Sequence, residues 1–72
     1  MTRTPVKSSQ ILEIGYDEKT LTLEVAFIKG GLYSYQPITS EAHKMLMSAE
    51  SVGSFFSKNI KGNEGIVCTK LK

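Results

Sequence analysis

The chain has 72 residues, which is enough for one small domain and too few for two. Hydrophobic residues make up 40% of it and charged residues 22%, unlike a disordered chain. One cysteine and one histidine exclude an intrachain disulfide and a closed zinc site of four such ligands, so we expect no metal and no cofactor. No apolar run reaches the roughly 20 residues of a membrane span, and the polar start has no signal-peptide core, which predicts a cytoplasmic protein with no membrane partner.

The positive charge is concentrated in the last third of the chain. The formal net charge is +2, yet residues 1–50 carry five basic and six acidic side chains. Residues 51–72 carry four lysines against Glu64 alone. This asymmetry is typical of a polyanion-binding surface or of an ordinary solvated face. A clear nucleic-acid-binding surface is usually accompanied by a pI above about 9. The sequence pI here is 8.8, so charge alone favours the solvated face.

Alternating apolar and polar side chains predict strands early in the chain. Residues 1–7 are expected to be a flexible lead-in. A first strand is predicted over residues 9–16 and a second over residues 20–27, with a polar turn between them. The predicted apolar face of this pair consists of Leu12, Ile14, Tyr16, Leu21, Leu23, Val25 and Phe27. Gly30-Gly31 fits a tight primed turn, and residues 32–36 form the returning strand of an antiparallel meander.

The period of the apolar residues changes to that of amphipathic helices after Pro37. Thr39 or Ser40 can cap a first helix, and Ser51 can cap a second. Gly62 suits the position just past the second helix. The apolar faces of the two helices are Ala42, Met45, Leu46, Ala49, Val52, Phe55, Phe56 and Ile60.

These segments predict an α+β fold in which two short helices pack on one face of a three-stranded antiparallel β-meander. The other face of the sheet is expected to be open. Residues 63–72 form either a short fourth strand at the sheet edge or a C-terminal tail. The expected common core is Leu23, Val25, Phe27, Leu46, Phe55, Phe56 and Ile60.

Two short motifs give the chain a family resemblance. The first is Tyr33-Ser34-Tyr35, and the second is the stretch SVGSFF over residues 51–56, followed by Ile60-Lys61. In this order and spacing they resemble the KTSC domain over residues 8–62. The family is named for its place at the C-terminal end of some lysyl-tRNA synthetases. Members often continue with an aromatic residue and further basic residues, whereas this chain continues with residues 62–65, GNEG.

The resemblance implies a small, non-catalytic binding module of bacterial or phage type whose biological role is unknown and for which RNA binding has been proposed. The leading hypothesis is therefore a weak RNA or other nucleic-acid partner. The alternative is a protein-interaction or self-associating module that uses the open sheet face or a strand edge. Salt-sensitive binding would indicate the first, and a concentration-dependent mass would indicate the second.

The candidate stacking residues are Tyr33 and Tyr35, which share one face of a predicted strand. On an open face their rings could stack on successive bases. The alternative is that both rings pack under a helix. Their polar alternates, Ser34 and Gln36, mark the tyrosine face as the apolar one and favour the packed arrangement.

The candidate phosphate contacts lie on the second helix. Lys58 and Lys61 share its predicted solvent side with Ser54, and Asn59 could add a hydrogen bond. The alternative is that these lysines complement the helix dipole and keep the surface solvated.

A catalytic site would have to use His43 or Cys68. His43 has no suitably spaced carboxylate along its helix, and Cys68 shows no sign of a partner histidine. We therefore predict that the chain is not an enzyme. His43 is interpreted as a surface residue and Cys68 as a free thiol or small apolar filler.

Overall fold

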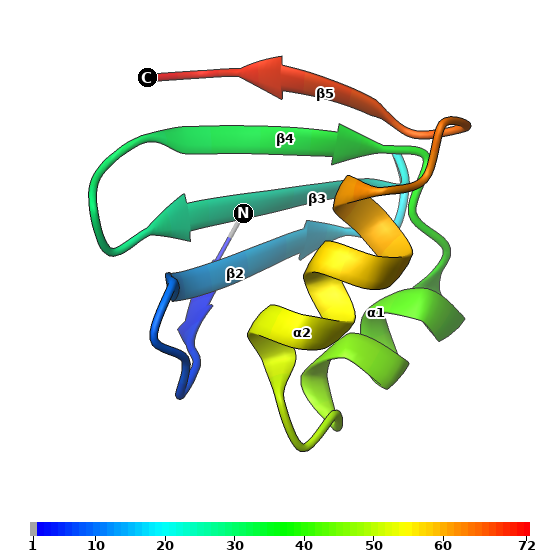
Figure 1. Ribbon diagram of the computed structural model, residues 1–72. Coiled ribbons are helices and arrows are strands. Elements are labelled where there is room, and N and C mark those ends of the chain that lie inside the picture. Colours follow the sequence, from blue (N-terminus) through cyan, green and yellow to red (C-terminus); the bar gives the residue numbers. More distant parts are fainter. Residues whose placement is uncertain (1) are drawn as a thin grey trace.

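The fold is built on an antiparallel sheet in which each strand pairs with the next one along the chain. The computed structural model describes residues 2–72, and Figure 1 shows its arrangement. The five strands are β1 (Arg3–Pro5), β2 (Ile11–Asp17), β3 (Thr22–Phe27), β4 (Leu32–Gln36) and β5 (Val67–Lys70). Their order in the sheet is β1-β2-β3-β4-β5. The predicted α+β class and meander are confirmed, and the sheet is larger than expected.

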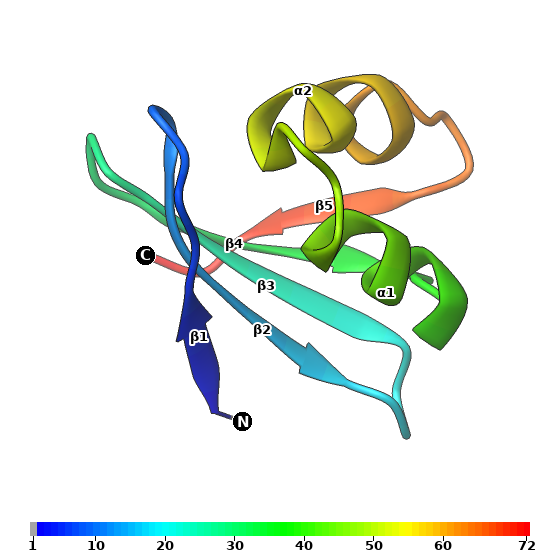
Figure 2. The ribbon, with the colours of Figure 1, turned by 90° about the horizontal axis from the view of Figure 1, so that it is seen from below.

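Two helical segments cover one face of this sheet, as Figure 2 shows. They are α1 (Ser40–Met47) and α2 (Val52–Phe56), and α2 continues into a π-helical turn, η1 (Ser57–Lys61). The side chain of Thr39 accepts a hydrogen bond from the amide of Ala42, and that of Ser51 accepts one from the amide of Ser54. Both helix starts are therefore capped by predicted residues. No helix within residues 2–72 is long and apolar enough to cross a bilayer.

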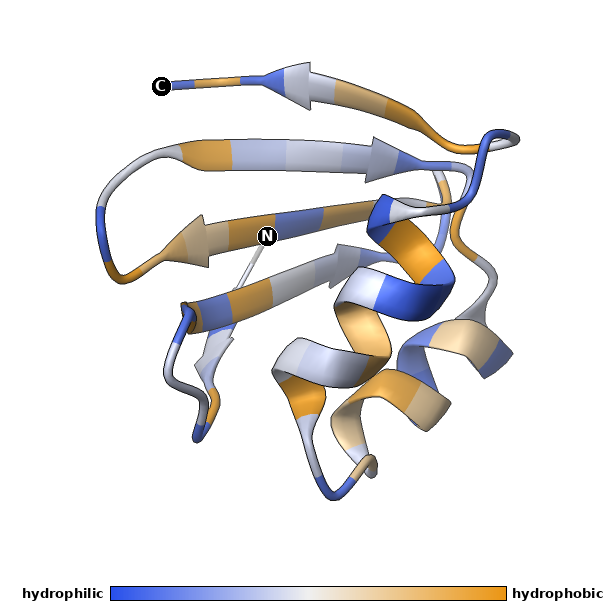
Figure 3. Cartoon of the chain, in the orientation of Figure 1, coloured by the Kyte–Doolittle hydropathy of each residue, from blue (hydrophilic) through white to orange (hydrophobic). Residues whose placement is uncertain are grey.

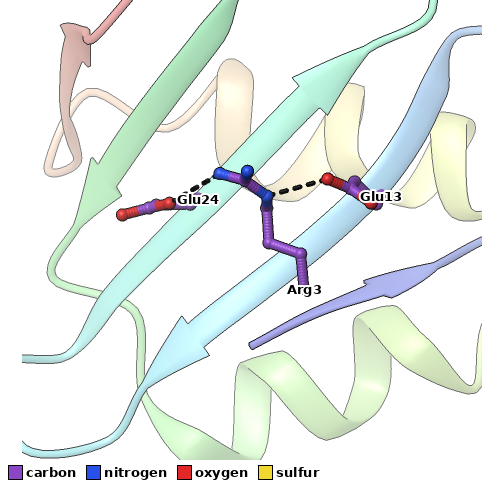
Figure 4. A network of polar contacts seen from close by, with 3 residues as sticks. All are labelled: Arg3, Glu13 and Glu24. Carbon is purple, nitrogen blue, oxygen red and sulfur yellow. Dashed lines mark hydrogen bonds and ion pairs between the residues drawn. The ribbon is translucent and has the colours of Figure 1, made fainter. Parts of the chain in front are cut away.

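Strand β1 lies within residues 1–7, the segment that was expected to be a flexible lead-in. For Arg3–Pro5 that prediction was wrong, because these residues pair with β2, with Arg3 opposite Gly15. The Arg3 guanidinium also contacts two carboxylates on the open face (Figure 4). Its Nε lies 2.8 Å from Oε1 of Glu13, and its Nη1 lies 3.2 Å from Oε1 of Glu24. Such cross-strand contacts produce no periodic signal in the sequence.

One predicted face residue of β2 was also assigned wrongly. Leu12 is 53% exposed, whereas Ile11 is fully buried. A bulge causes the difference, since Ile11 pairs with Phe27 and Glu13 pairs with the adjacent residue Ala26. The extra residue in β2 interrupts the alternation on which the prediction depended.

Within residues 63–72, for which an edge strand or a C-terminal tail was expected, Val67–Lys70 form the edge strand β5. β5 pairs antiparallel with β4, with Cys68 opposite Tyr35 and Lys70 opposite Tyr33. On the side of the sheet that faces the helices, the side chains of β4 therefore have the helices above them and β5 beside them.

The core lies between the helices and the sheet, and Figure 3 shows that both layers contain apolar segments. The predicted core residues Leu23, Val25, Leu46, Phe56 and Ile60 are buried, while Phe27 and Phe55 are partly buried against them. Sequence patterning missed Ile11 and Ile38 as core members. Val52, which was predicted on the apolar face of the second helix, and Tyr35 join the same cluster. No polar or charged residue among residues 2–72 is buried.

Candidate functional site

A groove of about 680 Å³ lies on the helix-facing side of the sheet, between the β3–β4 turn, η1 and β5. This volume is within the range of roughly 300–1,000 Å³ that is usual for ligand pockets. Its aromatic residues come from β3 and β4 and its basic residues from the turn and η1. The residues that give the groove its chemistry are Phe27, Lys29, Tyr33, Tyr35, Lys61 and Cys68.

Two other hollows have different chemistry. One of about 420 Å³ lies between α1 and η1, and neutral side chains such as those of Met45, Phe55 and Asn59 line it. The other, of about 700 Å³, is formed by residues 16–19 at the β2–β3 turn, two of which are acidic. Of these three hollows, only the groove combines several aromatic rings with lysines.

Tyr33 and Phe27 are the half-buried aromatic residues of the groove. The ring of Tyr33 meets that of Phe27 edge to face, with centroids 5.6 Å apart. Gly31 helps to set the position of this ring, because a Cβ atom at residue 31 would lie 3.0 Å from Cε1 of Tyr33. The φ of +99° at Gly31 also favours glycine. The turn residues therefore support the placement of the Tyr33 ring in the groove.

Tyr35 has a different environment on the same strand face. Only 4% of it is exposed, and its ring meets that of Phe56 edge to face. Burial raises the pKa of the Tyr35 hydroxyl, and its hydrogen bond with the Cys68 thiol raises the pKa further. Tyr35 thus has the packed arrangement that was the alternative to base stacking.

The lysines give the groove a positive character. Lys61 lies at the end of η1, and Lys29 directly precedes the Gly30-Gly31 turn. Lys70 lies opposite Tyr33 in the sheet register, on the same face as the groove. No acidic side chain belongs to the groove lining within the described part of the chain. Sequence analysis missed Lys29 as a candidate, although its position beside a tight turn was a possible signal.

The remaining predicted contacts do not line this groove. Ser54 is exposed near the start of α2, and Lys58 is exposed on η1. Asn59 lines the hollow between α1 and η1, where its Nδ2 donates a hydrogen bond to the carbonyl of Phe55 over 3.1 Å. The prediction assumed a continuous α-helix, but the period changes at Ser57. The structure therefore brings Lys61 together with the tyrosines and leaves the other three outside.

The histidine and the cysteine are far apart. His43 stacks on Tyr16 of β2, with ring centroids 4.5 Å apart and planes 10° apart, and burial lowers its pKa. Cys68 is an exposed free thiol on β5, three strand positions from β2. That separation corresponds to about 14 Å across the sheet. The geometry therefore provides no Cys–His pair, and residues 2–72 contain no cluster of three or more potential metal ligands.

Comparison with known proteins agrees with this fold. The profile of the KTSC domain matches residues 7–63. An uncharacterized protein of Stutzerimonas stutzeri is 36% identical over 61 residues, which cover 85% of this chain and 86% of that protein. A lysine–tRNA ligase of Nostoc punctiforme is 36% identical over 56 residues, which cover 78% of this chain and 10% of the ligase.

A crystal structure of a KTSC domain protein from Yersinia pestis is also similar, with a TM-score of 0.92 and 44% sequence identity. The match covers 99% of this chain and 97% of that one, so it includes both edge strands of the sheet. The family profile and the uncharacterized relative indicate no catalytic family. The chain belongs to the KTSC domain family.

Proposed function

We propose that this KTSC domain is a non-catalytic binding module whose groove takes single-stranded RNA. The observation that carries the proposal is the half-buried ring of Tyr33 next to Lys29 and Lys61 in a groove without acidic lining residues. A base would stack on the exposed part of the Tyr33 ring, and the flanking phosphates would meet the lysines.

The arrangement of the aromatic rings supports a site for one base rather than two. Tyr35 is buried against Phe56 and has too little exposed surface to stack. Phe27 contacts Tyr33 edge-on, which leaves Phe27 as the support of the stacking ring. The proposed role of the second tyrosine is therefore structural.

A relative also favours RNA over other polyanions. The Nostoc punctiforme protein that contains a matching segment is a lysine–tRNA ligase. That segment is a small part of the enzyme, so an accessory contact with RNA fits its size. For this chain, we infer RNA as the first partner to test.

The expected affinity is low because few charges are available. If Lys29, Lys61 and Lys70 each contact one phosphate, the logarithm of the binding constant should fall with the logarithm of the salt concentration with a slope of about −2 for a single strand. Binding should lie in the range of about 10⁻⁴–10⁻⁶ M that is usual for non-specific complexes at physiological salt.

Nuclear magnetic resonance titration with a short single-stranded RNA at low salt tests the proposal. Backbone amide shifts should be concentrated at the groove residues, and Lys61→Gln should weaken binding and reduce the salt slope by about 0.7 unit. Lys19→Gln removes an equal charge at the β2–β3 turn, at the opposite end of the sheet, and should change little. If high-micromolar RNA shifts no groove resonance, the proposal fails.

The variant Lys58→Gln separates the groove from the helix surface that was predicted first. If Lys58→Gln weakens RNA binding more than Lys61→Gln does, the phosphates follow the exposed side of η1. The groove assignment would then be wrong, although RNA binding itself would stand.

A further inference from the structure

The two edges of the sheet differ in their capacity to pair with another strand. At one edge, β1 has only three residues, and Pro5 lacks an amide donor. At the other edge, all four residues of β5 are exposed, and Figure 1 shows no element of residues 2–72 beyond it. An open edge of this kind is a template for another strand.

The hydrogen bonds at the end of β5 define which backbone groups are free. The amide of Leu71 donates to the carbonyl of Leu32 over 2.7 Å, so Leu71 faces β4. The amide of Lys72 donates to the same carbonyl over 3.2 Å and its carbonyl accepts from the amide of Leu32 over 3.3 Å, so the regular alternation ends at Leu71. Backbone direction alternates along a strand, so Thr69 and Val67 also face β4. The amides and carbonyls of Cys68 and Lys70 therefore point outward.

The side chains alternate in the same way. Cys68 lies opposite the buried Tyr35, on the helix-facing side of the sheet. Val67, Thr69 and Leu71 therefore lie on the open face. Val67 is 67% exposed and Leu71 is 44% exposed. Two large apolar side chains thus stand on either side of Thr69, on one face of a free edge.

We propose that two copies of this chain pair antiparallel through β5, about a two-fold axis at Thr69. In this register the outward groups of Cys68 bond with those of Lys70 of the second copy. Val67 of each copy then lies opposite Leu71 of the other copy, so the two-fold axis creates two such pairs. Both are non-hydrogen-bonded pairs, in which the side chains are closest. The proposal depends on the fold alone and not on RNA binding.

Neighbouring registers are less favourable. An axis at Lys70 would place two ammonium groups opposite each other, which destabilises a strand pair. An axis at Cys68 would pair Val67 with Thr69 of the second copy and leave Leu71 without its apolar partner. The Thr69 register is therefore the one in which this edge is complementary to itself.

The pairing extends the sheet and keeps both sets of helices on one side. The axis of an antiparallel strand pair is perpendicular to the sheet, so side chains opposite each other share a face. The two grooves would lie on that side, with Lys70 of each copy next to Cys68 of the other. Two short strands bury little area, so the dimer should be weak and dependent on concentration.

Sedimentation equilibrium over a concentration series tests the association. The parent chain should show a rising mass, and Val67→Lys should shift the midpoint to a higher concentration. Adding Leu71→Glu to Val67→Lys should restore association, because each new lysine then faces a new glutamate. Met45→Lys is the matched control, since Met45 is 53% exposed on α1, and it should leave the mass curve unchanged. A parent chain that remains monomeric at millimolar concentration would overturn the proposal.

Disulfide trapping tests the register. Thr69→Cys in a Cys68→Ser chain brings two thiols together at the axis, where Cα atoms about 4.5 Å apart allow a disulfide. An added oxidant should cross-link this variant faster than the parent chain, whose Cys68 faces Lys70 of the second copy. Faster cross-linking of the parent would refute the Thr69 register. Circular dichroism of each variant verifies that the fold is retained.

Discussion

The ring of Tyr35 meets the ring of Phe56 edge to face, with centroids 5.1 Å apart, and so links the C-terminal part of β4 to α2. Tyr33 lies on the same face of β4 but packs beside Phe27, nearer to the β3–β4 turn. One strand face therefore carries a core residue and a groove residue. The difference arises because Phe56 of α2 contacts the second tyrosine.

The contact between Tyr35 and Phe56 explains why removal of the Phe56 ring should reduce the stability of the fold more than removal of any other ring. Phe56 is 1% exposed and meets Tyr35 and Phe27 edge to face. Phe56→Ala should reduce the free energy of unfolding by about 3–5 kcal/mol, through lost burial and the cavity that remains. Urea unfolding measures this loss. Met45→Ala, at a half-exposed residue, should cost much less, and equal midpoints for Phe56→Ala and the parent would contradict the burial.

The ion pairs of Arg3 should contribute little. The side chains of Arg3 and Glu13 are 35% and 29% exposed, so water screens their attraction. Arg3→Gln should lower the free energy of unfolding by about 1 kcal/mol or less, mainly at low salt. Thermal unfolding at low and high salt measures the difference. Lys7→Gln, at an exposed lysine nearby, is the charge-matched control, and an equal loss in both variants would show that the contacts with Glu13 and Glu24 do not matter.

His43 should make stability depend on pH. Burial lowers its pKa in the folded state below the unfolded value of about 6.5, so folding favours the neutral imidazole. This contribution is present above pH 6.5 and is lost as the pH falls through the folded pKa. The imidazole resonances should titrate below pH 6.5. His43→Phe keeps a ring over Tyr16 and should show a smaller loss of thermal stability on acidification, whereas an identical loss would assign it to other groups.

Much of the fold could be predicted because periodicity records which side of an element is buried. The alternation at Leu23 and Val25 and the helical spacing of Phe56 and Ile60 both reflect contact with one core. The pattern failed at Leu12, where a bulge adds one residue to β2. It also missed β1, whose three residues are exposed and have no apolar face to bury.

The candidate site was less predictable because a groove depends on how far one element extends over another. The Tyr33 and Tyr35 pattern is the same in the sequence, and only the position of α2 separates the two rings. Lys29 and Lys61 are 32 positions apart, and the hairpin and the end of η1 bring them to one groove. No local spacing contains that information.

The two tyrosines provide the sharpest test of the proposed RNA site. Tyr33→Leu removes one half-buried ring of the groove and should weaken RNA binding by about 1–3 kcal/mol while the fold stays intact. Tyr35→Leu removes a buried ring that packs on Phe56, so its main effect should be on the unfolding midpoint. RNA titrations and urea unfolding of both variants separate these effects. If Tyr33→Leu binds RNA as tightly as the parent while Lys61→Gln binds more weakly, the lysines contact phosphate and no base stacks on Tyr33.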